Sequence, residues 1–314
     1  MNMKIKTCLL VTLIAGLAGA QIYPLEHQWS ARLKAVDDNG VPVTGAKIRV
    51  SYSVYTTNQI SGLTDTNGSF VATHHDATEN LSINAEKQGY YPFSFTYYKG
   101  DYQPARWNPN LTVLLRKIGK PIAMYAQRAR IEVPELGKPI GFDLMEGDWV
   151  APYGHGKTSD FIFEAQRRFN SWQDFDSSFS LTFHSPDDGL FAISMPLDQG
   201  STLRLPAVAP KSGYATELSG QLSDTPSKAW ETSEKKDQNY YFRVRTVKDD
   251  GGNIVSAHYG KIYGDFKIDA INSKTLLIFF QYYLNPTPNS HNVEFDPKQN
   301  LFHQLSNRQL VNAP

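Results

Sequence analysis

Residues 239–284 read NYYFRVRTVKDDGGNIVSAHYGKIYGDFKIDAINSKTLLIFFQYYL, and this stretch decides the fold. Hydrophobic and aromatic residues recur at every second position from Tyr240 to Val244, which is the period-two pattern of a half-buried β-strand. Arg243 and Arg245 stand at the intervening positions. They predict that the other face of this strand is solvated.

Two turn signals divide the rest of the stretch into further strands. Asp249–Asn253 is rich in Asp, Asn and Gly, which adopt the positive φ of tight hairpins, and Asn272-Ser273 marks a second turn. The run Leu276–Phe280 contains no polar residue, as is typical of a strand covered on both faces. The stretch therefore predicts a β-meander whose last strand lies at the centre of a core.

The composition limits the class of protein. With 314 residues, the chain is long enough for about two domains. Its 31 basic residues balance 31 acidic residues, so no overall field attracts nucleic acid or an anionic membrane. Aromatic residues make up 12% of the chain, which is enough for a sizeable hydrophobic core. We expect a folded protein with no nucleic-acid partner.

The first 20 residues have the pattern of a cleaved signal peptide. Lys4 and Lys6 precede an apolar run at residues 8–15, and Ala18-Gly19-Ala20 provides small residues for cleavage. The run is too short for a transmembrane anchor. Cys8 is the single cysteine and leaves with this segment, so the mature chain has no disulfide. The pattern predicts export to the periplasm or the extracellular space.

Residues 21–99 alternate between short strands and Asx-Gly turns, which predicts a small β-sandwich able to fold alone. Three of its segments, Val36–Ile48, Gly62–Phe70 and Lys87–Tyr90, resemble the motifs of carboxypeptidase-regulatory-like and transthyretin-like bacterial modules. Bacterial immunoglobulin-like modules fit the same motifs. The resemblance covers residues 28–98 and implies a non-catalytic, seven-stranded accessory sandwich. It transfers no catalytic residue.

Residues 106–302 are expected to form a second, larger antiparallel β-sandwich, jelly-roll-like in type, so that the fold class is all-β. Within it, Phe161–Phe169 suits a strand or a short helix, residues 196–226 suit a long excursion with only short strands, and residues 229–237 suit a surface loop. Residues 303–314 are expected to be a loose tail. The region from residue 240 to residue 297 resembles exported bacterial proteins of unassigned function, which implies no chemistry.

The segment Gly154–Thr158 has the Gly-Lys-Thr ending of a phosphate-binding loop. The full motif needs a glycine at position 151, where this chain has Ala151. A glycine-rich loop without phosphate is the favoured interpretation. The nearby acids Asp143, Glu146 and Asp148 could form a carboxylate pair, but a solvated edge explains them equally well.

Several groups of metal-ligating residue types occur, and each has a simpler explanation. His74-His75-Asp76 with Glu79 lacks the spacing of a zinc site. Asp187-Asp188 near His184 lies in an expected hairpin turn, and the acidic turns lack the ligand series of a calcium loop. We expect turn chemistry here, and neither a metal nor a cofactor.

Four aromatic residues fall in loop-like or strand-end surroundings, where exposed rings stack on sugars. These candidate binding residues are Trp107, Trp149, Tyr153 and Trp172. Core packing is the competing interpretation, since it is what most tryptophans in a β-sandwich do.

No motif places a catalytic nucleophile or an acid–base pair. We therefore expect an exported, non-enzymatic binding or structural protein of the bacterial cell envelope or secreted fraction. The alternative is a carbohydrate-binding domain or a carbohydrate-active hydrolase in the second unit. Candidate partners are a polysaccharide or another envelope protein.

Overall fold

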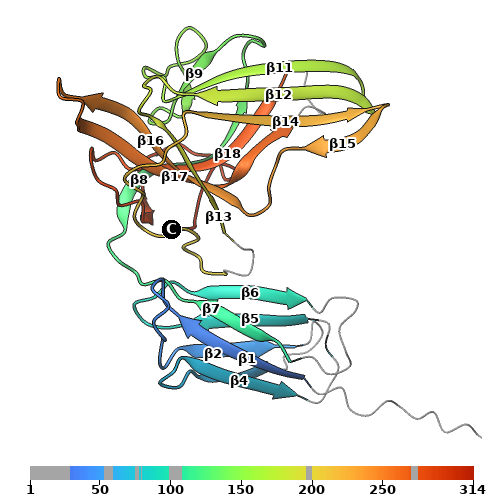
Figure 1. Cartoon of the computed structure of the whole chain (residues 1–314), viewed down its shortest axis with the longest axis vertical. Helices are drawn as coiled ribbons and strands as arrows, with labels where there is room; N and C mark the ends of the chain where they lie inside the picture. The colour runs from blue at the N-terminus through green and yellow to red at the C-terminus, as the bar shows by residue number, and fades with distance from the viewer. Residues whose placement is uncertain are drawn as a thin grey trace, which may run out of the picture.

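A computed structural model describes residues 29–52, 59–74, 78, 80–98, 108–195, 200–269 and 275–314 (Figure 1). Within these ranges the chain forms nineteen strands arranged as two β-sandwiches, which confirms the predicted all-β fold. The same ranges hold no helix long and apolar enough to cross a membrane. The predicted signal peptide (residues 1–20) and Trp107 lie outside the described residues.

The first sandwich has seven described strands, six of which lie within residues 28–98, the range of the resemblance. Its two sheets have the orders β4(Ser69–His74)-β1(Trp29–Val36)-β7(Asn110–Leu114) and β3(Gln59–Leu63)-β2(Lys47–Ser51)-β5(Asn80–Glu86)-β6(Phe93–Tyr98). Alternate residues of these strands, among them Leu33, Ile48 and Ile83, are buried between the sheets. The period-two pattern of the sequence is therefore the pattern of this core.

The last strand of the first sandwich lies beyond the predicted end of the domain at residue 99. β7 pairs in parallel with β1, and Leu111 pairs with Leu33. Leu111, Val113 and Leu115 are buried in the first core. The expectation that residue 106 opens the second domain is corrected, because alternation identifies a strand but not the sheet it joins.

The second sandwich consists of two six-stranded sheets packed face to face (Figure 1). The upper sheet has the order β10(Asp148–Trp149)-β9(Ile140–Asp143)-β11(Phe161–Ser171)-β12(Asp174–Thr182)-β14(Glu217–Thr225)-β15(Lys228–Thr232). The central sheet has the order β13(Gly189–Ser194)-β16(Gln238–Lys248)-β17(Ile254–Asp269)-β18(Leu277–Leu284)-β8(Ile122–Glu132)-β19(Phe295–Asn300). Pairing is antiparallel throughout except between β19 and β8.

Residues 161–171 form strand β11, which is the first of the two predicted alternatives. Another part of the second sandwich differs from the sequence-based expectation. The β14–β15 hairpin occupies a region expected to be an excursion and a surface loop. Its strands are rich in Ser, Gly and charged residues, because their outer face is solvated, so hydrophobic alternation is weak there.

Strand β18 lies inside the central sheet, between β17 and β8, as the meander predicts. Ile278 and Tyr282 are buried against the upper sheet, in a core dominated by phenylalanine. Tyr283 is buried on the opposite face, among tyrosines and the C-terminal segment. Phe279 is only partly buried and lies 5.6 Å from the guanidinium of Arg130. The strand is thus covered on both faces at its end and on one face in its middle.

The prediction that one face of β16 is solvated is wrong. Arg243 is buried, and its guanidinium donates to the carbonyl of Asp187 and lies over the ring of Tyr214. The register of β16 shifts after Val244, where Arg245 adopts a φ of +57°. This bulge turns the side chain of Arg245 toward the upper sheet.

The prediction that residues 303–314 form a loose tail is also wrong, because these residues pack on the central sheet. Val311 is buried, the amide of Arg128 donates to the carbonyl of Gln309 at 2.9 Å, and the hydroxyl of Tyr263 donates to the carbonyl of Pro314 at 2.7 Å. The segment has too few hydrophobic residues for its sequence to indicate burial.

The two sandwiches are joined by direct hydrogen bonds. The carboxylate of Glu294 accepts hydrogen bonds from the hydroxyl of Tyr91 at 2.8 Å and from the amides of Gly119 and Lys120 at 2.8 and 2.7 Å. Residue 200 of the second unit accepts a backbone hydrogen bond from Ser94 of β6 at 2.9 Å. Hydrogen bonds therefore hold the two sandwiches together at two places, at Glu294 and at residue 200.

The two faces of β18 predict unequal effects of a buried charge. Ile278→Asp should abolish the cooperative melt or lower the unfolding free energy by several kcal/mol, because the carboxylate would have no partner in the core. Phe279→Asp should cost much less, because its side chain is partly exposed beside Arg130. Urea unfolding of both variants measures the difference. Equal losses would contradict the assignment of the two faces.

Candidate functional site

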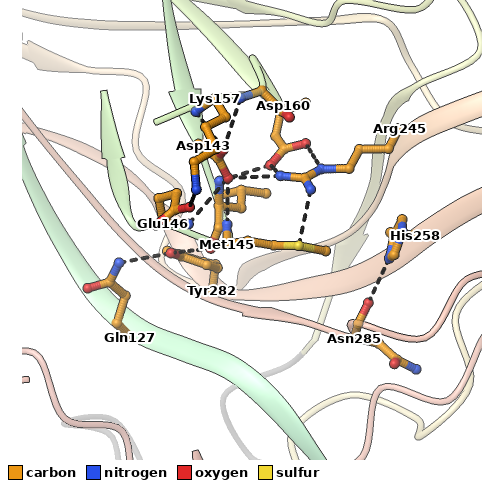
Figure 2. Close-up of polar contacts among 12 residues, drawn as sticks. Gln127, Asp143, Met145, Glu146, Lys157, Asp160, Arg245, His258, Tyr282 and Asn285 are labelled. Atoms are coloured by element: carbon orange, nitrogen blue, oxygen red, sulfur yellow. Dashed lines mark hydrogen bonds and ion pairs between the residues drawn. The ribbon is translucent and has the colours of Figure 1, made fainter. Parts of the chain in front are cut away.

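Asp143, Asp160 and Arg245, which we name the Arg245 corner, join the two sheets of the second sandwich (Figure 2). Asp143 ends β9, Asp160 directly precedes β11, and Arg245 belongs to β16 of the central sheet. The Nε of Arg245 donates to Asp160 at 2.7 Å. Its Nη2 donates to Asp160 and to Asp143, each at 2.8 Å. Both carboxylates are buried, so this arrangement is an ion cluster inside the protein.

The carboxylate of Asp143 organises the loop around it. It accepts backbone hydrogen bonds from Met145 at 2.9 Å, Lys157 at 3.0 Å and Thr158 at 2.9 Å. Burial alone would raise the pKa of Asp143, but these amides and the guanidinium lower it. Asp143 therefore remains charged, and its oxygens are occupied.

A third acid holds the bulge that presents Arg245. The carboxylate of Asp188 accepts hydrogen bonds from the amides of Arg245 at 3.1 Å and Thr246 at 3.0 Å. A residue other than glycine at positive φ persists only where its surroundings determine it. Here the cap and the ion cluster do so together.

The glycines of the 154–158 loop serve packing. A Cβ at Gly154 would meet the carbonyl oxygen of Trp149 at 2.4 Å, and one at Gly156 would meet it at 2.9 Å. The amides of Lys157 and Thr158, which a phosphate would need, already donate to Asp143. These contacts support the interpretation as a glycine-rich structural loop.

A groove of about 650 Å³ opens beside the Arg245 corner. The loop at residues 145–158 lines one part of it, and the C-terminal segment at residues 301–309 lines another. Of the lining acids, Asp143 is saturated as described, and Glu146 forms a 2.6 Å ion pair with Lys157. Neither is placed as a free general acid or base. The groove presents amides and rings, such as Gln304 and Phe302, to solvent.

Trp149 is a core residue, which corrects its prediction as a binding residue. Its side chain is 7% exposed, and its Nε1 donates to the carbonyl of Glu132 at 3.0 Å. The ring lies edge-on to Phe142 at 5.5 Å. Its polar neighbours in the sequence suggest a surface position, but its strand closes the edge of the upper sheet over the core.

Tyr153 and Trp172 are both exposed, at 40% and 58%, but they do not form one site. Tyr153 lies in the loop before β11 and donates to Glu135 at 2.6 Å. Trp172 lies in the turn after β11. Glu135 belongs to a loop whose Gly137 donates to the carbonyl of Ala165 in the middle of β11, whereas Trp172 follows the end of that strand. Each must therefore be considered with its own neighbours.

Trp172 belongs to a cluster that we name the aromatic end, consisting of Phe169, Trp172, Phe175 and Trp230. The β11–β12 and β14–β15 hairpins turn at the same end of the upper sheet (Figure 1). Phe169 lies 6.2 Å from Trp172, and Phe175 lies 5.9 Å from Trp230, both edge to face. Phe175 is fully buried beneath the others, while Phe169 and Trp230 are 41% and 53% exposed.

Polar residues alternate with the rings of the aromatic end along β11 and β12. Asp174 accepts hydrogen bonds from Arg168 at 2.7 Å and from Asn170 at 2.9 Å. The guanidinium of Arg167 lies 4.9 Å from the ring centroid of Phe169. Phe169 and Trp230 are not among the binding residues predicted from the sequence. A tryptophan in the otherwise polar segment 229–237 was the available signal.

At the predicted acidic turn Asp187-Asp188, turn capping is not found: the carboxylate of Asp188 caps the bulge at Arg245, and that of Asp187 pairs with Lys248 at 2.6 Å. The other three acidic turns follow turn chemistry, as predicted. Asp37, Asp65 and Asp249 each accept hydrogen bonds from the amides two and four residues further on. His74 packs 4.1 Å from Tyr52, while His75, Asp76 and Glu79 lie outside the described residues. Among the residues with described positions, no three His, Cys, Asp or Glu side chains are grouped to hold a metal.

Comparison with known proteins assigns no family. No family model matches the chain, and no curated protein matches it. Several solved structures match the chain. One is 3-chlorocatechol 1,2-dioxygenase from Rhodococcus opacus, at 13% sequence identity and a TM-score of 0.25. The match covers 29% of this chain and 60% of the dioxygenase chain. A streptococcal ancillary pilin matches with 11% identity, 79% and 62% coverage, and a TM-score of 0.23. The major pilin subunit of Bacillus cereus matches with 10% identity, 80% and 95% coverage, and a TM-score of 0.24.

The chain spans less than two thirds of the dioxygenase and of the ancillary pilin, 60% and 62% respectively. TM-scores this low transfer no function. The relation of residues 28–98 to carboxypeptidase-regulatory-like modules remains a prediction, and function is argued below from the chain's own residues.

Proposed function

We propose that this chain is a non-enzymatic, polysaccharide-binding protein of the cell envelope or secreted fraction, and that the aromatic end is its recognition surface. The observation that carries the proposal is the exposure of Phe169, Trp172 and Trp230 in one cluster. Large exposed aromatic groups are unfavourable in water and gather where a protein meets a ligand or partner. Export rests on the signal-like segment at residues 1–20.

The surface is built on a rigid base. Phe175 is fully buried beneath it, with Leu222 and Ile268 packed alongside. The two turns that carry Trp172 and Trp230 belong to hydrogen-bonded hairpins of one sheet. A preorganised pair of rings loses little conformational entropy when a ligand binds.

The chemistry around the rings favours a polysaccharide as the ligand. The apolar C–H faces of a sugar pack on indole rings, and its hydroxyls need polar partners at the edge. Arg168, Asn170 and Asp174 bring donors and acceptors to the hairpin turn that carries Trp172. An extended chain of sugars could contact both tryptophans in succession.

The Arg245 corner supports the non-enzymatic part of the proposal. Asp143 and Asp160 are engaged by amides and by Arg245, and Glu146 is paired with Lys157. Acid–base catalysis of glycoside hydrolysis needs one carboxyl group that can donate a proton and another that acts as base or nucleophile. Asp143 and Asp160 are thus engaged in structural contacts, and Glu146 forms an ion pair at the surface.

Retention on insoluble polysaccharides tests this function. We expect the protein to bind at least one of cellulose, chitin, xylan and peptidoglycan. Trp172→Ala and Trp230→Ala should each weaken binding by about tenfold or more, because each removes one stacking ring worth about 1.4 kcal/mol or more.

Tyr153→Ala is the matched control, since Tyr153 is an exposed aromatic residue outside the aromatic end, held by Glu135. It should bind like the parent protein. Retention on none of the four materials, or unchanged retention of a Trp172→Ala/Trp230→Ala double variant, would refute the proposed surface. Thermal melts of all variants should stay close together, because the substitutions are at exposed positions.

A further inference from the structure

A second cavity lies where the two sandwiches meet, and none of its described lining residues belongs to the aromatic end. We name it the junction cleft, and its volume is about 410 Å³, within the range of small-molecule sites. Ser94 and Phe95 of the first sandwich line one part of it. The remaining lining belongs to the second unit and includes residues 200–202, Arg204 and residues 236–239. Clefts between domains are frequent ligand sites.

A buried hydroxyl without a partner lines this cleft. Ser201 is 4% exposed, and its Oγ has no hydrogen-bond partner among the described residues. The backbone around it is fixed, because Thr202 donates to the carbonyl of Pro92 at 3.0 Å and Gly200 accepts from Ser94 at 2.9 Å. A buried polar group is nearly always hydrogen-bonded, so an unpaired one indicates a missing acceptor or donor.

Two cations also line the cleft. Within the described part of the chain, neither Arg204 nor Lys236 forms an ion pair. Arg204 is held by its position over the ring of Tyr263, with 5.6 Å between guanidinium and centroid. Asp237 is the acid among the lining residues, so positive charge is in excess there. A guanidinium recognises carboxylate and sulfate groups through paired N–H donors.

We propose that the junction cleft binds a small oxyanion, a carboxylate or sulfate group of the kind that acidic sugars carry, with Arg204 and Lys236 as counter-charges and Ser201 as a hydrogen-bond donor. The size of the cleft suits one sugar residue. Because both sandwiches contribute to its walls, a bound anion would also strengthen the contact between them. The proposal is independent of the aromatic end, which lies on other strands.

Calorimetric titration of the full chain tests the proposal, with sodium glucuronate, sodium sulfate and glucose as probes at constant ionic strength. We expect saturable binding of glucuronate or of sulfate and none of glucose. Glucuronate alone would identify a carboxylate site, and sulfate alone a sulfate site. Saturable binding of neither anion, or equal binding of glucose, would overturn the proposal.

Variants locate the binding. Arg204→Gln and Ser201→Ala should each raise the Kd of the bound anion at least tenfold, whereas Lys211→Gln, at an exposed lysine outside the cleft, should leave it unchanged. Ser201→Ala should leave the melting temperature of the free protein unchanged, because its hydroxyl makes no hydrogen bond there. Unchanged anion affinity in Arg204→Gln would contradict the site.

Discussion

Arg245→Met will lower the free energy of unfolding by about 3 kcal/mol or more, because it leaves two buried carboxylates without their counter-charge. Methionine keeps most of the volume of the arginine stem, so lost packing contributes little. The carboxylate of Asp160 is fully buried and would have to lose its charge or draw in water. Chemical denaturation at neutral pH measures the loss.

Lys138→Met is the matched control for this experiment. Lys138 pairs with Glu135 at 2.7 Å, but both side chains are largely exposed, and solvent screens such pairs so that they contribute little to stability. It should therefore melt like the parent protein. A stability of Arg245→Met equal to that of Lys138→Met would show that the corner is not an energetic link between the sheets.

A fragment of residues 21–99 will not fold, whereas a fragment of residues 21–119 will. The longer fragment adds β7, which pairs along β1 and places Leu111, Val113 and Leu115 in the core. It also keeps the backbone hydrogen bond from Ile118 to Gly89 at 2.9 Å. Without β7, a small domain loses core that it cannot spare.

Amide dispersion and hydrogen exchange distinguish the two fragments. Residues 21–119 should show dispersed amide resonances and protected strand amides, and residues 21–99 should exchange like a random coil. Protection of β1 amides in the shorter fragment would mean that β7 only covers a finished sandwich. The direct expectation from the sequence was that the shorter fragment suffices, and the position of β7 reverses it.

The sequence predicts the strands with strong alternation and the turns with Asx and Gly. β16, β17 and β18 form the expected meander, and Asp37, Asp65 and Asp249 cap their turns as expected. These features depend on neighbours within a few residues. The central position of β18 could also be predicted, because its apolar composition indicates burial.

Long-range partners explain what the sequence could not predict. The solvated interpretation of Arg245 failed because its carboxylate partners lie 85 and 102 residues away. Phe169 and Trp230 meet only because two hairpins turn at the same end of one sheet. Of the four predicted aromatic residues, Trp149 is in the core, Trp107 is outside the described residues, and Tyr153 and Trp172 are exposed at separate places.

Fluorine NMR of the 5-fluorotryptophan-labelled protein tests recognition at the aromatic end most directly. Resonances are assigned by single Trp→Phe substitutions, and a soluble oligosaccharide of the retained polysaccharide is titrated in. Trp172 and Trp230 should shift with one common Kd, while the buried Trp29 and Trp149 should stay in place. Saturable binding that leaves both Trp172 and Trp230 unshifted would contradict the account.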